Sequence, residues 1–491
     1  MRGRRWFEYA EVVVSRAFSN AKFRFALYAT ALAFATFLIL SYYPCIYLCP
    51  LLHHYKEPSP PPPRSFSERV EHVQQVVRNQ RQYLPLSAEY IRLHESSNTD
   101  IADDWYDIFN CPMQPPPSYP MEFPIMNVLN HWPIADTKMT DTRYIHQGFC
   151  VFDFAKQQPE QLRQQMHNYQ KAEKPFVVKN HPEALKTAER WNTAGYLDYK
   201  LQRKVYRGEF SKTLSMMYWS ISRFHKIPKG FVPPTQLRPT TFEKWKLRAE
   251  AMEQEIDAAT SQSEDKVYLR LDGCESPNKR CDALQRMWGA LGAGIYLLTR
   301  IDDADFMHDE LPFFSPRYYS QGTSKDFLVE PEKSRGIQCR FGAKGTQLGA
   351  AFVFLTVVSH LLPSLRVTGL VAEDHFDNER NFIAVLGGER RYLLSHPNNC
   401  KDLYLYPMAH PLERHTEVNW FSPDLTKFPN FEHVHVNEVV LQAGDIMYLP
   451  TYWFHHIVSL TLNYQCNVRS GHSLHYDQDI YDCGFLYPWP A

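Results

Sequence analysis

The triplet His375-Phe376-Asp377 and a later imidazole, His455, are residue types that can bind one metal ion. Side chains alternate between the two faces of a β-strand, so residues two apart point the same way. On one strand, His375 and Asp377 could therefore reach the same ion, and His455 could join them from another strand. Two imidazoles and one carboxylate, with the other coordination positions open, form the arrangement typical of non-haem Fe(II) oxygenases. The spacing therefore predicts a metal centre with room for further ligands.

The residues around the triplet favour strands that end in turns. An apolar run at 381–388 ends in two glycines, and we interpret 389–394 as the returning strand of a hairpin. A second stretch at 439–450 has a strand, a Gly-Asp turn and another strand that ends at a proline. Ligands carried by antiparallel strands near turns are what a small barrel requires.

Histidine pairs at strand spacing also arise by chance, because the chain contains 21 histidines. Most such residues lie at the surface or in the core with satisfied hydrogen bonds. His433 and His435 form a second pair, which we interpret as exposed strand because no suitable carboxylate accompanies it. Trp453 and Phe454, directly before His455, we interpret as core packing around the site.

Taken together, these segments resemble the JmjC-type cupin hydroxylases, which depend on Fe(II) and 2-oxoglutarate. They are most similar to the branch of the asparaginyl hydroxylase that inhibits the hypoxia-inducible factor. The resemblance implies a mostly β fold, with a double-stranded β-helix (cupin or jelly-roll) core and flanking α-helices. It covers about the last 120 residues, with a fainter likeness at 174–178 and 188–191. The similar stretches are 375–394, 403–411, 427–431 and 444–460.

The resemblance also implies which residues would bind the metal. His375, Asp377 and His455 match the iron ligands of the family. His455 is chosen over His456 because the family's ligand directly follows an aromatic pair, here Trp453-Phe454. His456 lies one step along the strand and would face away from the site.

Three further residues match positions that bind the cosubstrate. Arg390 matches the basic residue that holds the far carboxylate of 2-oxoglutarate, a lysine in the asparaginyl hydroxylase, and an arginine can do this bidentately. Asn381 and Asn467 match polar residues near the cosubstrate. Ala372 departs from the pattern, because the asparaginyl hydroxylase has a threonine there that helps to bind 2-oxoglutarate.

The N-terminal region predicts a membrane anchor. Residues 25–43 contain no formal charge and are about as long as the ~20 residues that one helix needs to cross a bilayer. The basic segment 1–24 precedes this run, and the positive-inside tendency places it in the cytosol. The remainder would then face the lumen of the endoplasmic reticulum or Golgi. A cleaved signal peptide and a buried globular helix are the alternatives.

The rest of the chain divides by composition. Residues 44–125 are rich in proline and predict a stalk and linker, and 126–491 predict the oxygenase domain. Within this domain, 157–172 and 241–259 have helix-forming composition, and the charged second segment we interpret as an exposed insert. The apolar segment 347–370 is an atypical insertion that we suspect to be a retained intron, because its removal would join 345–346 to 371 as in the family.

Composition limits the partners of the protein. The formal net charge is −1, from 53 basic and 54 acidic residues, so no basic footprint for nucleic acid is expected. Two of the ten cysteines, at 45 and 49, lie beside the predicted span, and the other eight come later and allow disulfides in an oxidising lumen. Among these eight, the pair at 274 and 281 is the closest in sequence, but the pairing and the oligomeric state cannot be derived from the sequence.

The expected function is therefore that of an Fe(II)- and 2-oxoglutarate-dependent dioxygenase, anchored to a membrane, which hydroxylates or demethylates a protein or peptide side chain. Two alternatives remain open. One is a membrane-tethered binding protein on the same scaffold that has lost catalysis. The other is a cupin enzyme, such as an isomerase, that uses a different metal without 2-oxoglutarate.

Overall fold

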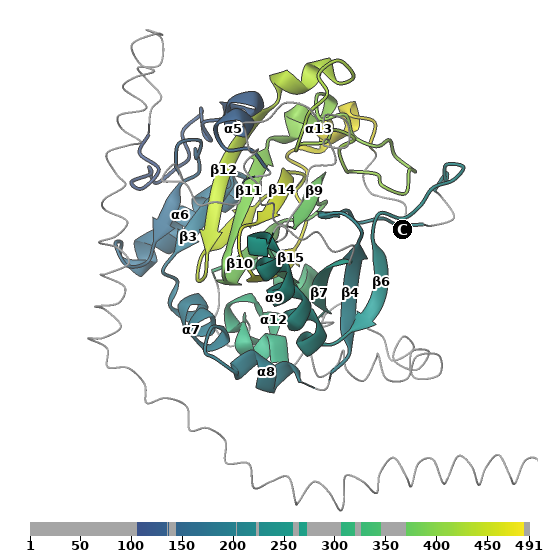
Figure 1. Cartoon of the computed structure of the whole chain (residues 1–491). Helices are drawn as coiled ribbons and strands as arrows, with labels where there is room; N and C mark the ends of the chain where they lie inside the picture. Colours follow the sequence, from purple (N-terminus) through teal and green to yellow (C-terminus); the bar gives the residue numbers. More distant parts are fainter. Residues whose placement is uncertain are drawn as a thin grey trace, which may run out of the picture. The chain divides into compact units, whose positions relative to one another are not determined.

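The computed structural model describes residues 106–134, 136, 144–202, 204–221, 225–258, 265–272, 306–319, 326–344 and 370–485 (Figure 1). The predicted span at 25–43 and its basic flank lie outside these residues, as does almost all of the suspected insertion. Among the residues that the structure describes, no helix has the length and apolarity needed to cross a bilayer.

Two β-sheets form the centre of the described fold, and Figure 1 shows β12, β11, β14 and β9 of the smaller sheet side by side. The six-stranded sheet contains, in spatial order, β1 (Phe123–Pro124), β12 (His435–Gln442), β11 (Glu389–Ser395), β14 (Phe454–Ser459), β9 (Val371–Phe376) and β5 (Ser215–Met216). The nine-stranded sheet contains β2 (Val151–Asp153), β3 (Phe176–Lys179), β13 (Ile446–Leu449), β10 (Asn381–Gly387), β15 (Asn463–Ser470), β8 (Ser334–Gly342), β7 (Lys266–Asp272), β4 (Tyr206–Ser211) and β6 (Gln236–Thr240). The predicted mostly β class is confirmed.

The eight strands from β8 to β15 pass repeatedly between the two sheets, as in a jelly roll. The predicted hairpin at 381–394 is therefore wrong. Strand β10 pairs with β13 and β15 in one sheet, whereas β11 pairs with β12 and β14 in the other. Gly388, at the crossing, has a φ of +63°, and a Cβ there would lie 1.9 Å from the carbonyl oxygen of Leu462. Only glycine satisfies both constraints, so the glycine pair carries the chain between sheets.

Strand β10 shows how the layers of the fold are built. All seven of its residues are buried, because its two faces contribute to different cores. Phe382, Ala384 and Leu386 belong to a cluster shared with the helices, whereas Ile383 and Val385 belong to a cluster shared with the six-stranded sheet. A helix layer therefore covers the outer face of the nine-stranded sheet, and the smaller sheet covers its inner face.

The α-helices are α5 (Ile125–His131), α6 (Pro159–Lys171), α7 (Pro182–Trp191), α8 (Tyr196–Leu201), α9 (Phe242–Ala258), α12 (Pro316–Tyr319) and α13 (Asp477–Asp482). Short 3₁₀ helices are η1 (Pro312–Phe314), η2 (Pro331–Lys333), η3 (Pro397–Lys401) and η4 (Pro429–His433). Helices α6 and α9 confirm the two helices predicted from composition. The interpretation of α9 as an exposed insert is wrong, because Phe242, Trp245 and Met252 are buried in the core.

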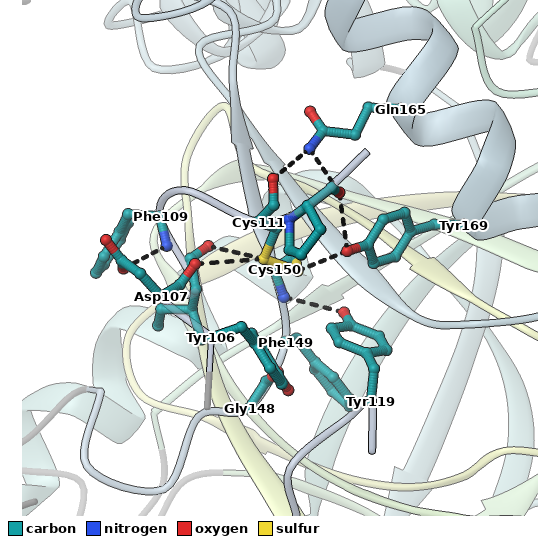
Figure 2. Close-up of a disulfide and its surroundings, with 12 residues drawn as sticks. Tyr106, Asp107, Phe109, Cys111, Tyr119, Gly148, Phe149, Cys150, Gln165 and Tyr169 are labelled. Atoms are coloured by element: carbon teal, nitrogen blue, oxygen red, sulfur yellow. Dashed lines mark hydrogen bonds between the residues drawn. A yellow bond between two sulfur atoms is a disulfide. The ribbon is translucent and has the colours of Figure 1, made fainter. Parts of the chain in front are cut away.

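Residues 106–124, which precede the expected start of the domain at 126, also pack against the fold. The Tyr106 hydroxyl donates a hydrogen bond to Gly148 O (2.6 Å), and Tyr119 donates to Pro175 O (2.5 Å). A disulfide joins Cys111 to Cys150 at the start of β2, and Figure 2 shows the aromatic rings around it. The packed fold therefore begins at least as early as Tyr106.

Two more disulfides connect described residues. Cys339 of β8 and Cys466 of β15 are paired across neighbouring strands, and Cys400 in η3 is joined to Cys483 after α13. The cysteines at 274 and 281 lie outside the described residues. Leu370, the last residue of the suspected insertion, donates a hydrogen bond from its N to Ala343 O (3.3 Å), so the end of the insertion lies next to residues that precede it. Its origin in a retained intron stays a prediction.

Candidate metal centre

The structure brings His375, Asp377 and His455 together. His375 lies near the end of β9 and is paired in register with His455 of β14, while Asp377 directly follows β9. The potential ligand atoms of the three residues lie within 4.8 Å of one another. The distance from Asp377 Oδ2 to His455 Nε2 is 3.9 Å. Asp377 and His455 are buried, and His375 is partly exposed.

Both imidazoles are oriented by backbone carbonyls. The Nδ1 atom of His375 lies 2.7 Å from Glu373 O, and that of His455 lies 3.0 Å from Trp453 O. Because a carbonyl can only accept, each Nδ1 carries the proton, and the unprotonated Nε2 is left for a metal. In both cases this tautomer follows from the fixed position of the backbone carbonyl of the residue two positions earlier in the sequence.

Asp377 is held as a carboxylate by its neighbours. Arg469 Nη2 donates to Asp377 Oδ2 (2.6 Å), and Asn381 Nδ2 donates to the same oxygen (3.2 Å). Burial alone would raise the pKa of Asp377, but Arg469 and the two imidazoles hold that pKa below its ordinary value. The group is therefore ionised at neutral pH and can act as an anionic ligand.

The two imidazoles are held in the neutral form. Burial lowers the pKa of both His375 and His455, and the neighbouring imidazoles lower that of His375 further. His415 stacks on His375, with ring centroids 5.0 Å apart, and burial lowers its pKa to about 3. Two neutral imidazoles and one carboxylate with converging ligand atoms fit a divalent transition metal.

Strand β15 carries a line of polar side chains along the inner face of the larger sheet. Every second residue from Asn463 to Arg469 is polar, and period-two alternation places all four on one face. Asn467 Nδ2 donates to Asn381 Oδ1 (3.0 Å), so both predicted asparagines belong to the hydrogen-bonded support of Asp377. From the sequence we predicted Asn467 as a site residue but not Asn463, Gln465 or Arg469, although the same alternation indicates all four.

Arg390 lies on β11 at the other end of this polar line. Its Nε and Nη1 donate to the side-chain oxygens of Asn463 and Gln465, and its Nη2 donates to Arg340 O (3.3 Å). The residue is only 1% exposed. It has no carboxylate partner among the residues that the structure describes, although burying an unpaired charge is costly. The residues around Arg390 therefore fit an anionic ligand such as the far carboxylate of 2-oxoglutarate.

Hydroxyl groups line the same region. Arg390 and Ser459 are paired in register across β11 and β14, and the Tyr268 hydroxyl lies 3.4 Å from Ser459 Oγ. A Cβ at Gly342 would lie 2.6 Å from the Tyr268 ring and 3.1 Å from Arg390, so glycine keeps this space open. Ala372 pairs with Ile457 and adds no polar group.

Other residues near the triplet have structural positions. His456 lies on the outer face of β14 and stacks on Trp420 with ring centroids 4.7 Å apart and parallel planes. Trp453 and Phe454 are fully buried in the core, as predicted. His433 and His435 are exposed, as predicted, but only His435 lies in a strand, because His433 is the last residue of the 3₁₀ helix η4.

Comparison with known proteins agrees with this geometry. A family model for a cupin-like domain matches residues 162–471, which is more than half of the chain. The chain belongs to the cupin-like domain family. Its cupin-like domain includes β3, every strand from β8 to β15 and all three residues of the metal centre.

The relatives of this cupin-like protein have names that state different activities. It is 35% identical over 91 residues to the tRNA wybutosine-synthesizing protein 5 of Mus musculus, covering 18% of this chain and 27% of that protein. It is 29% identical over 111 residues to the lysine-specific demethylase JMJ31 of Arabidopsis thaliana, covering 21% and 20%. With the lysine-specific demethylase 8 of Danio rerio it shares 32% identity over 96 residues, covering 20% and 23%. The matches thus span only a fifth to about a quarter of each relative.

Proposed function

We propose that this cupin-like protein is an Fe(II)- and 2-oxoglutarate-dependent dioxygenase that hydroxylates or demethylates a protein side chain. The observation that carries the proposal is the convergence of His375, Asp377 and His455, with each imidazole turned so that Nε2 remains free. Names of the relatives include demethylases and an RNA-modifying protein, so the family fits oxidation of more than one substrate class. The finer likeness to the asparaginyl hydroxylase stays a prediction.

Each residue of the site has a distinct task in this proposal. His375, His455 and Asp377 would hold the metal, and a set of two imidazoles and one carboxylate would leave coordination positions for further ligands. Arg469 and Asn381 fix the carboxylate of Asp377, so that it presents one oxygen inward. When bound, iron and 2-oxoglutarate supply the oxygen-activating chemistry.

The protein's remaining task is to position the cosubstrate and to exclude water. Arg390 would hold the far carboxylate of 2-oxoglutarate with its planar fork, as arginine does for carboxylates in general. The fork is already oriented by Asn463 and Gln465, which lowers the entropy lost on binding. The buried surroundings strengthen this charge pairing because the local dielectric constant is low.

We further propose that a membrane anchor at 25–43 holds the domain in the lumen of the endoplasmic reticulum or Golgi. The uncharged run and its basic flank at 1–24 support the anchor. Three disulfides among the described residues support the location, because disulfides persist in oxidising compartments and are rare in the cytosol. The protein substrate would then be a secreted or membrane protein.

The proposal is tested by succinate formation from 2-oxoglutarate. Full-length protein in detergent is supplied with Fe(II), 2-oxoglutarate and air, and is compared with His375→Ala and with His435→Gln, which changes an exposed histidine outside the site. We expect His375→Ala to lose at least about 100-fold of the rate, because it removes a metal ligand, and His435→Gln to keep the wild-type rate. Equal rates for wild type and His375→Ala would contradict the proposal and favour a binding protein without catalysis.

A further inference from the structure

A cavity of about 290 Å³ lies against the six-stranded sheet, at the edge formed by β9 and β5. Glu373 of β9 and Ser215 of β5 line it from the sheet, and residues of the segment 416–421 line it from the other side. Neither the three metal ligands nor Arg390 lines it. Its volume is near the lower end of the roughly 300–1,000 Å³ that ligand sites have. This outer cavity can therefore hold one side chain or a small molecule of similar size.

A bulge in β9 turns the Glu373 side chain away from the metal centre. His375 and Ala372 pair with residues of β14 that are two positions apart and share one face, yet they are themselves three positions apart, so β9 has an extra residue between them. Such a residue shifts the alternation of side chains, so His375 and Ala372 face inward and Glu373 faces outward. His456, on the same outer face, has its Nδ1 3.8 Å from Glu373 Oε2. The outer cavity and the metal centre therefore lie on opposite faces of β9.

The Glu373 carboxylate has one oxygen without a hydrogen bond. The residue is only 8% exposed, and the Ser215 hydroxyl donates to its Oε1. Oε2 lies beyond hydrogen-bond distance of His456. No lysine or arginine in the described part of the chain forms an ion pair with Glu373. Since a buried charge without a partner is costly, Oε2 is suited to a donor that a ligand brings.

The solvent side of the outer cavity adds a second carboxylate. Glu417 is exposed, and it also has no ion pair with a lysine or arginine among the residues that the structure describes. Burial, Glu417 and Glu373 raise the pKa of Tyr406, so its hydroxyl stays neutral near both carboxylates. Leu214 and Val418 supply apolar walls. The cavity therefore combines apolar walls with an acidic group at its inner end and another at its mouth.

The segment that forms the mouth is fixed by hydrogen bonds. Thr416 N donates to Asp374 O (3.1 Å), and the Thr416 hydroxyl donates to Leu403 O (2.6 Å). Glu417 N donates to Tyr404 O (2.9 Å). The outer cavity is therefore formed before a ligand binds, which lowers the entropy lost on binding.

We propose that the outer cavity binds the side chain of a lysine from a protein or peptide partner. Lysine joins an apolar stem to a charged head, which matches apolar walls that lead to a carboxylate. Its ammonium is a compact charge with three donors and needs only the one free oxygen of Glu373. Arginine fits less well, because its planar fork pairs with both oxygens of a carboxylate and Ser215 already bonds one of them.

This inference goes beyond the proposed function and does not depend on it, because the outer cavity shares no residue with the metal centre. The test therefore measures binding without metal. Pools of fluorescent dodecapeptides carry one central lysine among randomised uncharged residues, and matched pools carry Nε-acetyl-lysine or arginine there. Binding to the full-length protein in detergent and chelator is followed by fluorescence anisotropy. We expect the lysine pool to bind at least about tenfold more tightly than the acetyl-lysine pool, as a hydrogen bond between charged groups allows.

Variants connect the preference to the outer cavity. Glu373→Gln should abolish the preference for lysine. Glu417→Lys should also abolish it, because it places a competing ammonium at the mouth, and an exposed position tolerates this change. Glu432→Lys is the matched control, with the same change of charge at an exposed position of η4 outside the cavity. That variant and His375→Ala should both keep the wild-type preference.

Four results would overturn the inference. They are equal binding of the lysine and acetyl-lysine pools, tighter binding of the arginine pool, an unchanged preference in Glu417→Lys, and a preference that is lost in His375→Ala. The last would place the lysine at the metal centre. Succinate formation by a protein without any lysine preference would reject this inference and keep the proposed function, whereas a lysine preference in a protein that forms no succinate would do the reverse.

Discussion

Arg390 and Arg391 are neighbours on β11, but their side chains lie on opposite faces of the six-stranded sheet and have different surroundings. Arg391, on the outer face, is fully buried, pairs with Glu438 through Nε and lies 4.2 Å from the Trp132 ring. Arg390, on the inner face, is buried to the same degree, lies 5.5 Å from the Tyr268 ring and donates its hydrogen bonds only to neutral oxygens. The outer arginine has its countercharge within the fold, whereas the inner one has none among the residues that the structure describes.

This difference distinguishes a buried charge with a structural role from one with a functional role in this fold. A buried charge whose partner is built in contributes to a fixed native state, and breaking the pair is costly. A buried charge without a partner reduces stability until a ligand supplies one. By this criterion Arg391 belongs to the scaffold, whereas Arg390 belongs to a site.

The largest expected effect is on the outer face. Arg391→Met should lower the free energy of unfolding by about 3–5 kcal/mol, because the buried Glu438 carboxylate loses its arginine partner. Chemical denaturation of the purified protein measures this change. The double variant Arg391→Met with Glu438→Gln should recover at least half of the loss. An Arg391→Met variant as stable as wild type would contradict this account of Arg391.

The inner face should respond in the opposite way. Arg390→Met should weaken 2-oxoglutarate binding about 100-fold, because the far carboxylate loses a buried bidentate partner. Its cost in unfolding free energy should be no more than about 1–2 kcal/mol, since only hydrogen bonds to neutral amides are lost. Calorimetric titration and denaturation give the two values. Wild-type affinity for 2-oxoglutarate in this variant would remove Arg390 from the cosubstrate site.

The buried His456 tests the comparison through the pH dependence of the free energy of unfolding. Burial, with Arg391 and His455 nearby, lowers its pKa to about 3 from the ordinary 6.5. Between these values the unfolded chain binds the proton and the folded chain does not, so stability falls as the pH falls through this window. From pH 6.5 to 5.0 this histidine should cost about 2 kcal/mol. Other buried histidines such as His415 lose stability in the same window, so denaturation should show that wild type loses about 2 kcal/mol more than His456→Phe between the two pH values, and equal losses would refute the assignment.

The smallest effect concerns the support of Asp377. Asn381→Ala should weaken Fe(II) binding about tenfold, as is usual for residues that hold a metal ligand in place. Competition with a fluorescent chelator under anaerobic conditions measures the affinity. Asn398→Ala, at an exposed position of η3, is the control and should bind as wild type. An Asn381→Ala variant with unchanged affinity would mean that Arg469 alone orients Asp377.

The sequence allowed the metal ligands to be predicted because their geometry is local. Strand periodicity alone puts His375 and Asp377 on one face, and the aromatic pair before His455 matched a family pattern. The hairpin at 381–394 was predicted wrongly because two glycines between apolar runs look the same in a tight turn and in a crossing between sheets. Only the pairing of β10 and β11 with different strands distinguishes the two cases.

Other parts of the site depend on contacts between distant segments. The approach of the Tyr268 hydroxyl to Ser459 beside Arg390 joins residues 191 apart in the sequence, so no local pattern reveals it. The disulfide pairs are equally non-local, because many pairings of the cysteines fit the same sequence. Gln465 and Arg469 were the exception, since they follow from Asn467 by alternation alone.

The most direct test of the central claim is the amount of iron that stays on the full-length chain after anaerobic loading and removal of free metal. The geometry predicts about one iron per chain in wild type and in His435→Gln, and less than about a tenth of that in His455→Ala, since a structural ligand is lost. Iron content in His455→Ala equal to that of wild type would contradict the claim that His375, Asp377 and His455 form one metal centre.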